Sequence, residues 1–158
     1  MKALLLTFLI FSFPVLAENS ENPGFDHKLK SLDGAEISLE DLKGKFVLVK
    51  FWASWCRPCL RDLEQLSLFY KKNSDLQIDI VAISLDTDLS SAKLALKDNP
   101  LPFLILFDSD RALTNALNIN SLANIYVFDR KGNLIDAVPD QINNENQFRS
   151  IIGSYVKP

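Results

Sequence analysis

The chain contains two cysteines, and they lie two residues apart in the stretch Cys56-Arg57-Pro58-Cys59. An almost unbroken apolar run over residues 46–51 precedes them and predicts a strand buried on both faces. A strand that delivers a Cys-x-x-Cys pair onto the start of a helix is typical of a thiol-disulfide exchange centre. The spacing therefore predicts redox chemistry at these two sulfurs.

Each residue of this stretch suits a definite role. Cys56 is expected at a helix N-terminus, where unpaired N–H groups and the positive end of the helix dipole favour a thiolate, so it is the predicted nucleophile. Arg57 adds a positive charge beside that sulfur, and Pro58 suits a first helical turn, where its missing N–H would have no partner. Cys59, one turn further on, can attack a mixed disulfide on Cys56 and release the product, which makes it the predicted resolving thiol.

Two structural roles compete with this interpretation. A purely structural disulfide would close a ring of roughly four residues and stabilise the domain by only about 2 kcal/mol. A closed zinc site needs four ligands, whereas the chain offers two thiols and a distant histidine, His27. We therefore expect no metal, and no cofactor beyond a redox-active Cys56–Cys59 disulfide.

The N-terminus has the pattern of a secretory signal. Lys2 precedes an apolar stretch over residues 3–16, and Val15-Leu16-Ala17 has small or aliphatic residues where a signal peptidase reads. The stretch is shorter than the roughly 20 residues that span a bilayer, so cleavage after Ala17 is favoured over an uncleaved anchor. This predicts a signal peptide at residues 1–17 and one exported domain at residues 18–158.

Charge and size narrow the function further. The 158 residues include 17 basic and 20 acidic side chains, for a formal net charge of -3. The basic residues are scattered among acids, so the sequence predicts no nucleic-acid partner. The length suffices for a single substantial core.

Strand and helix patterns alternate along the rest of the chain, which predicts an α/β fold with a central mixed sheet flanked by helices. A β-hairpin with Asp33-Gly34 at its turn is expected at the N-terminal end. Further strands are expected at residues 46–51, 78–84, 103–107, 125–128 and 134–138. Helical segments are expected at residues 38–42, 89–97, 111–117 and 144–156, together with the helix that starts at the cysteine pair and ends near residue 73.

The sequence resembles the periplasmic thioredoxin-fold proteins of the TlpA/ResA type over nearly all of the mature chain. The resemblance rests on the cysteine motif at residues 51–59, supported by Gly44-Lys45, Ile83-Ser84-Leu85-Asp86 and the segment at residues 126–132. It implies a thioredoxin-like fold, a periplasmic location and a thiol-disulfide oxidoreductase that in most members acts as a reductant. The implied partners are protein thiols and disulfides and a membrane electron donor of the thiol-disulfide type; we expect a monomer.

The resemblance also implies roles near the thiols. Cys56 carries over as the attacking thiol and Cys59 as the resolving thiol, with Trp55, Arg57 and Pro58 as neighbours that tune the site. Asp62 stands where many members have a glutamate, three residues beyond the second cysteine, and its carboxylate could transfer protons to and from Cys59. The alternative is an ordinary solvated aspartate.

Two positions depart from the family pattern. The family's cis-proline, on the loop before the fourth strand, aligns with Ala123; because a non-proline cis bond costs about 3 kcal/mol, we expect a trans peptide there. That loop, predicted here as Leu122, Ala123 and Asn124, docks substrate in relatives. Lys50 stands where thioredoxin has a buried acid. Either its ammonium points toward Cys59 and favours the thiolate, or its stem lies along the core while its head reaches water.

Other functions on the same fold remain as alternatives. A peroxiredoxin-like thiol peroxidase needs a peroxidatic cysteine in a Pro/Thr-rich context earlier in the chain, which this sequence lacks. A copper chaperone would need a wider cysteine spacing and a histidine after the cysteines. A non-catalytic binding module is compatible with the altered loop at Ala123.

Overall fold

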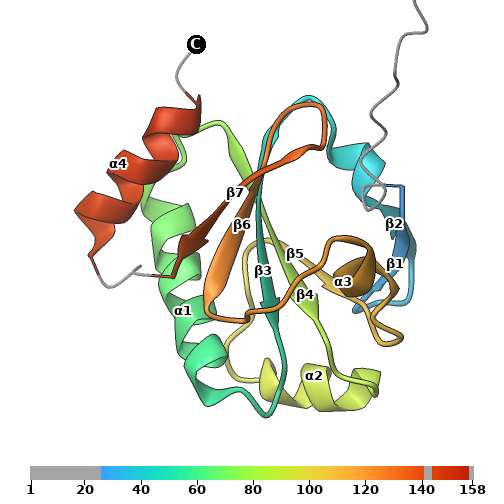
Figure 1. Cartoon of the computed structure of the whole chain (residues 1–158). Coiled ribbons are helices and arrows are strands. Elements are labelled where there is room, and N and C mark those ends of the chain that lie inside the picture. The colour runs from blue at the N-terminus through green and yellow to red at the C-terminus, as the bar shows by residue number, and fades with distance from the viewer. Residues whose placement is uncertain (1–25, 141–143, 157–158) are drawn as a thin grey trace, which may run out of the picture.

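The computed structural model describes residues 26–140 and 144–156, so the predicted signal peptide lies outside the described residues. Seven strands form one sheet in the order β2-β1-β5-β4-β3-β6-β7 (Figure 1). The strands are β1 (Lys28–Ser31), β2 (Glu36–Ser38), β3 (Phe46–Trp52), β4 (Ile78–Ser84), β5 (Leu104–Phe107), β6 (Asn124–Phe128) and β7 (Leu134–Pro139). The helices are η1 (Leu39–Leu42), α1 (Arg57–Lys72), α2 (Leu89–Ala95), α3 (Ala112–Ala116) and α4 (Glu145–Val156).

The sheet is mixed, as the sequence predicts. Its centre is parallel, because β3 pairs with β4 and β4 with β5 in the same direction. β6 and β7 extend the sheet antiparallel on one side, and β1 and β2 extend it antiparallel beyond β5. The β1–β2 connection turns at Gly34, whose φ of 91° is a conformation that glycine adopts without a steric penalty. The predicted central mixed sheet is confirmed.

Strand β3 packs on both faces, which explains its continuous apolar sequence. Val47, Val49 and Phe51 contribute to a core that also contains Leu39 of η1 and Leu113 of α3. The alternate residues face the other way because side chains along a strand alternate between the two faces of a sheet.

On that second face, Leu48 packs with Phe69 of α1 and Phe148 of α4, and Trp52 packs with Cys59 and Leu63 of α1. In Figure 1, α1 and α4 lie on one side of the sheet and α3 on the other. Position 50, between Leu48 and Trp52, thus belongs to the face covered by α1.

Across residues 26–140 and 144–156, none of the helices combines the length and the apolar character that crossing a bilayer requires.

Candidate active site

The two cysteines form a disulfide at the N-terminus of α1, with their Cα atoms 5.3 Å apart. Cys56 is the N-cap residue, and its sulfur accepts a hydrogen bond from the backbone N–H of Cys59 at 3.3 Å. Pro58 lies in the first turn, where it removes no helical hydrogen bond. A thiolate on Cys56 after reduction would therefore meet an N–H donor and the positive end of the helix.

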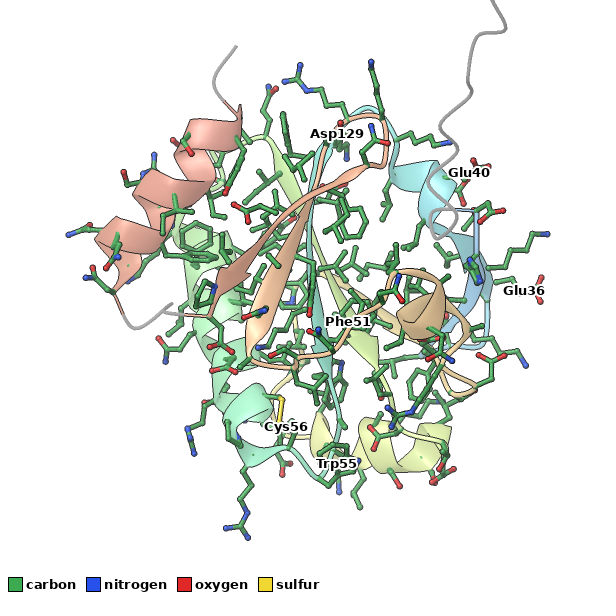
Figure 2. The ribbon with its side chains drawn as sticks, viewed as in Figure 1. Glu36, Glu40, Phe51, Trp55, Cys56 and Asp129 are labelled. Atoms are coloured by element: carbon green, nitrogen blue, oxygen red, sulfur yellow. A yellow bond between two sulfur atoms is a disulfide. The ribbon has the colours of Figure 1, made fainter. Side chains whose placement is uncertain are left out.

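Accessibility distinguishes the two sulfurs. Cys59 is 2% exposed and belongs to the core beside Trp52, whereas Cys56 is half-buried. The neighbouring Trp55 is 67% exposed at the end of the molecule where α1 begins (Figure 2). Cys56 is therefore the more accessible of the two sulfurs.

A buried carboxylate holds the backbone before the cysteines. Asp86 follows β4 and is 5% exposed. It accepts hydrogen bonds from the Ser54 N–H at 2.9 Å and the Ser54 hydroxyl at 2.7 Å, and a third from the Ser84 hydroxyl at 2.8 Å. Since Ser54 lies two residues before Cys56, these bonds anchor the loop that carries the exposed sulfur.

Lys50 makes the second polar group of the site, and the alternative in which its head reaches water is wrong. Its side chain is 0% exposed, so its head does not reach water. Its Nζ donates to Asp140 Oδ2 at 2.5 Å and to the Leu122 carbonyl at 2.7 Å, and it lies 3.1 Å from Asp62 Oδ2. The ammonium is thus paired with two carboxylates and does not present an unpaired positive charge to Cys59.

The same contacts determine the environment and the pKa of Asp62. Its side chain is 22% exposed and paired with Lys50, so the alternative of an ordinary solvated aspartate is wrong. Burial, and a hydrogen bond shared with the Asp140 carboxyl, raise the pKa of Asp62 to about 6, against the opposing charge of Lys50. We call the group Lys50, Asp62 and Asp140 the lysine cluster.

The predicted substrate loop lies beside the cysteines. Leu122 packs against the core cluster that contains Trp52 and Cys59, while Ala123 is exposed. No cis peptide bond occurs in the described residues, as the absence of proline at position 123 predicts. Asn124, predicted in the loop, is instead the first residue of β6 and pairs with Pro139.

A shallow pocket of about 200 Å³ adjoins this loop. Its walls are Trp55 from the cysteine motif, Arg111 at the N-cap of α3 and residues 119–122. The pocket lies between the exposed tryptophan and the loop.

Within the described residues, no cluster of three or more His, Cys, Asp or Glu side chains could hold a metal ion. The sequence did not predict the contact between Asp140 and Lys50. The two residues are 90 positions apart, and no local motif marks Asp140 as part of the site. Asp86 belongs to a segment that supports the family resemblance, but its contact with Ser54 was not predicted.

Comparison with known proteins identifies the family. The model of the AhpC/TSA family matches residues 21–137, which is most of the chain. The chain belongs to the AhpC/TSA family. The chain is 28% identical over 123 residues to the thiol-disulfide oxidoreductase ResA of Bacillus subtilis, covering 78% of this chain and 68% of that protein. It is 34% identical over 124 residues to the thioredoxin-like protein YneN of the same organism, covering 77% and 71%.

Solved structures share the fold of this chain. A thiol:disulfide interchange protein DsbE from Chlorobium tepidum superposes with a TM-score of 0.74 at 24% identity, covering 85% of this chain and 96% of that one. A thiol-disulfide oxidoreductase from Bacteroides vulgatus gives 0.69 at 25% identity, covering 90% and 95%. The resemblance to ResA-type proteins and the thioredoxin-like fold are confirmed. With its Cys56–Cys59 disulfide, this family member is a thiol-disulfide oxidoreductase.

Proposed function

We propose that the chain is an exported, periplasmic thiol-disulfide oxidoreductase that reduces disulfides in protein clients. The observation that carries this proposal is the Cys56–Cys59 disulfide at a helix N-terminus, with Cys56 accessible and Cys59 buried. The ResA proteins, themselves named thiol-disulfide oxidoreductases, support it. A membrane dithiol of the thiol-disulfide type is the proposed electron donor.

The reaction moves two electrons from the protein dithiol to the client disulfide. The Cys56 thiolate attacks one client sulfur, forms a mixed disulfide and expels the other client sulfur as a thiolate. The Cys59 thiolate then attacks Cys56, which re-forms the intramolecular disulfide and expels the second client thiolate. Each expelled thiolate takes up a proton, and the donor dithiol restores the reduced enzyme.

Asp62 is the proposed proton acceptor for Cys59. The two residues lie three positions apart on α1 and therefore on the same helix face. A carboxyl with a pKa of about 6 can take the thiol proton when Cys59 must attack and return it when the thiol re-forms. Arg57 is proposed to favour the Cys56 thiolate through its charge, and Trp55 and Leu122 to contact the client.

Trapping and turnover test the proposal together. The mature chain should reduce insulin disulfides with dithiothreitol as the electron source. The C59S variant should accumulate a covalent mixed disulfide with a client, and C56S should form none. If Cys56 does not react with iodoacetamide and the chain shows no turnover, the protein is instead a binding module. Turnover of hydrogen peroxide in place of insulin would indicate a peroxidase.

Export and assembly need separate measurements. N-terminal sequencing of protein recovered from the periplasm should begin at Glu18, whereas retention of Met1 would contradict cleavage after Ala17. Sedimentation equilibrium should give the mass of a monomer.

A further inference from the structure

Lys50 connects the core of the site to the loop that faces the client. An ammonium carries three protons, and Lys50 has three oxygen partners: the two carboxylates of the lysine cluster and the Leu122 carbonyl. Asp62 belongs to α1 and Asp140 directly follows β7, so the two carboxylates hold the ammonium from different parts of the fold. The two carboxylates therefore fix the position of the ammonium that donates to the Leu122 carbonyl.

The peptide between Leu122 and Ala123 is held at both of its polar groups. Its carbonyl accepts from Lys50 at 2.7 Å, and its N–H donates to the Ser121 hydroxyl at 3.1 Å. The next carbonyl, on Ala123, accepts from the Asp140 N–H at 3.1 Å. Two of these three bonds come from the lysine cluster residues Lys50 and Asp140, although the loop lies at the molecular surface.

The same loop has no proline to restrict it. Its exposed residue is Ala123, and its neighbour Leu122 packs against the cluster that contains Cys59. A short segment without proline loses more conformational entropy when a client binds, unless other contacts restrict it beforehand. The hydrogen bonds from the cluster supply that restriction.

We propose that Lys50 is a positioning residue for client recognition: its ammonium, held by Asp62 and Asp140, fixes the Leu122–Ala123 peptide against which the client chain lies. This inference rests on the proposed function, and it adds how the enzyme distinguishes a polypeptide disulfide from a small one. A polypeptide contacts the loop as well as Cys56, whereas a small disulfide needs Cys56 alone.

The test compares kcat/KM for insulin with kcat/KM for the small aromatic disulfide DTNB. In Lys50→Met, the ratio of the two should fall about tenfold, the size expected for losing one charge-assisted hydrogen bond to the loop. Exchange of the Ala123 amide hydrogen should become faster in the same variant. The matched control is Lys45→Met. The Lys45 side chain is 62% exposed and pairs with Asp79 on the surface, so this variant should keep the wild-type ratio and exchange rate.

Two results would overturn the inference. An unchanged ratio in folded Lys50→Met shows that the loop needs no help from Lys50, and an equal loss with both substrates places its role at the sulfurs. If Lys50→Met does not fold, Asp140→Asn is the second test of the inference. This variant keeps an acceptor for Lys50 but removes the negative charge. It should lower the ratio of the two kcat/KM values about threefold. A wild-type ratio and exchange rate in Asp140→Asn overturn the inference.

Failure of the proposed function is recognised separately. A wild-type chain that reduces neither disulfide overturns that function, and hydrogen exchange at Ala123 in Lys50→Met then tests the positioning role alone. Faster exchange supports it, and unchanged exchange overturns it.

Discussion

Two sets of polar side chains support loops of the site: Asp86 with its donors, and the lysine cluster. They hold these loops in different ways. Asp86 uses neutral donors, namely one backbone N–H and the hydroxyls of Ser54 and Ser84. The lysine cluster instead pairs two carboxylates with one buried ammonium, and only the ammonium reaches the loop. The first group supports the segment before Cys56, and the second supports the Leu122–Ala123 loop.

The difference separates two functions of the site. Asp86 binds Ser54, two positions before Cys56, so a change at Asp86 should alter exchange with every disulfide. The lysine cluster joins α1, the end of β7 and the loop, and its charges respond to pH because Asp62 has a pKa of about 6. Changes there should alter stability, client recognition and pH dependence.

The largest effect is expected from removing the buried ammonium. Lys50→Ala leaves two carboxylates facing each other without their cation and should lower the free energy of unfolding by about 3 kcal/mol in urea denaturation at pH 7. The control, Lys45→Ala, removes an exposed ion pair and should change it by under about 0.5 kcal/mol. Equal effects of the two variants would mean that the lysine cluster contributes no more than a surface pair.

An intermediate effect is expected at Asp86. Asp86→Ala leaves the buried donors of Ser54 and Ser84 without their acceptor, so unfolding should become easier by about 2 kcal/mol, and reduction of insulin and DTNB should slow alike. As a control, Asp88→Ala removes the exposed N-cap of α2, which should cost about 1 kcal/mol and leave both rates unchanged. Loss of insulin turnover without loss of DTNB turnover in Asp86→Ala would contradict the separate roles of Asp86 in exchange and of the lysine cluster in client recognition.

The smallest effect is expected from Asp62→Asn, and its sign depends on pH. The pKa of Asp62 is raised from 3.8 to about 6, so the folded protein binds more protons than the unfolded chain between about pH 4 and pH 6. The contribution of Asp62 to the free energy of unfolding therefore falls as pH rises through that window. The variant lacks this decline, so its stability relative to wild type should rise by under about 1 kcal/mol across the window, because the carboxyl is partly exposed.

Asp75 provides a control of opposite sign. Its hydrogen bonds and charge interaction with Arg149 lower the pKa of Asp75, so its stabilising contribution is present above its unfolded pKa and is lost as pH falls through its folded pKa. Asp75→Asn should therefore lose stability relative to wild type as pH rises from low values toward its unfolded pKa. Parallel pH curves for Asp62→Asn and Asp75→Asn would contradict the raised pKa of Asp62.

Most of the fold could be predicted because its signals are local. The run at residues 46–51 and the observed strand Phe46–Trp52 agree closely, and residues 78–84 agree exactly with β4. Helix ends were predicted less accurately. The predicted helix ended at residue 97, whereas α2 ends at Ala95, because cap contacts and not the apolar pattern set its boundary. The polar partners of Lys50 were not predicted because they depend on packing among three separate elements.

By itself, the sequence determined the chemistry: the spacing of Cys56 and Cys59 places both sulfurs at one helix N-terminus, and local backbone geometry suffices for that. The tertiary structure alone decided how the site is supported. Asp140 meets Lys50 from 90 positions away, and the burial that raises the pKa of Asp62 exists only when α1 covers β3. Long-range charge pairs depend on the relative placement of whole elements, which no local pattern encodes.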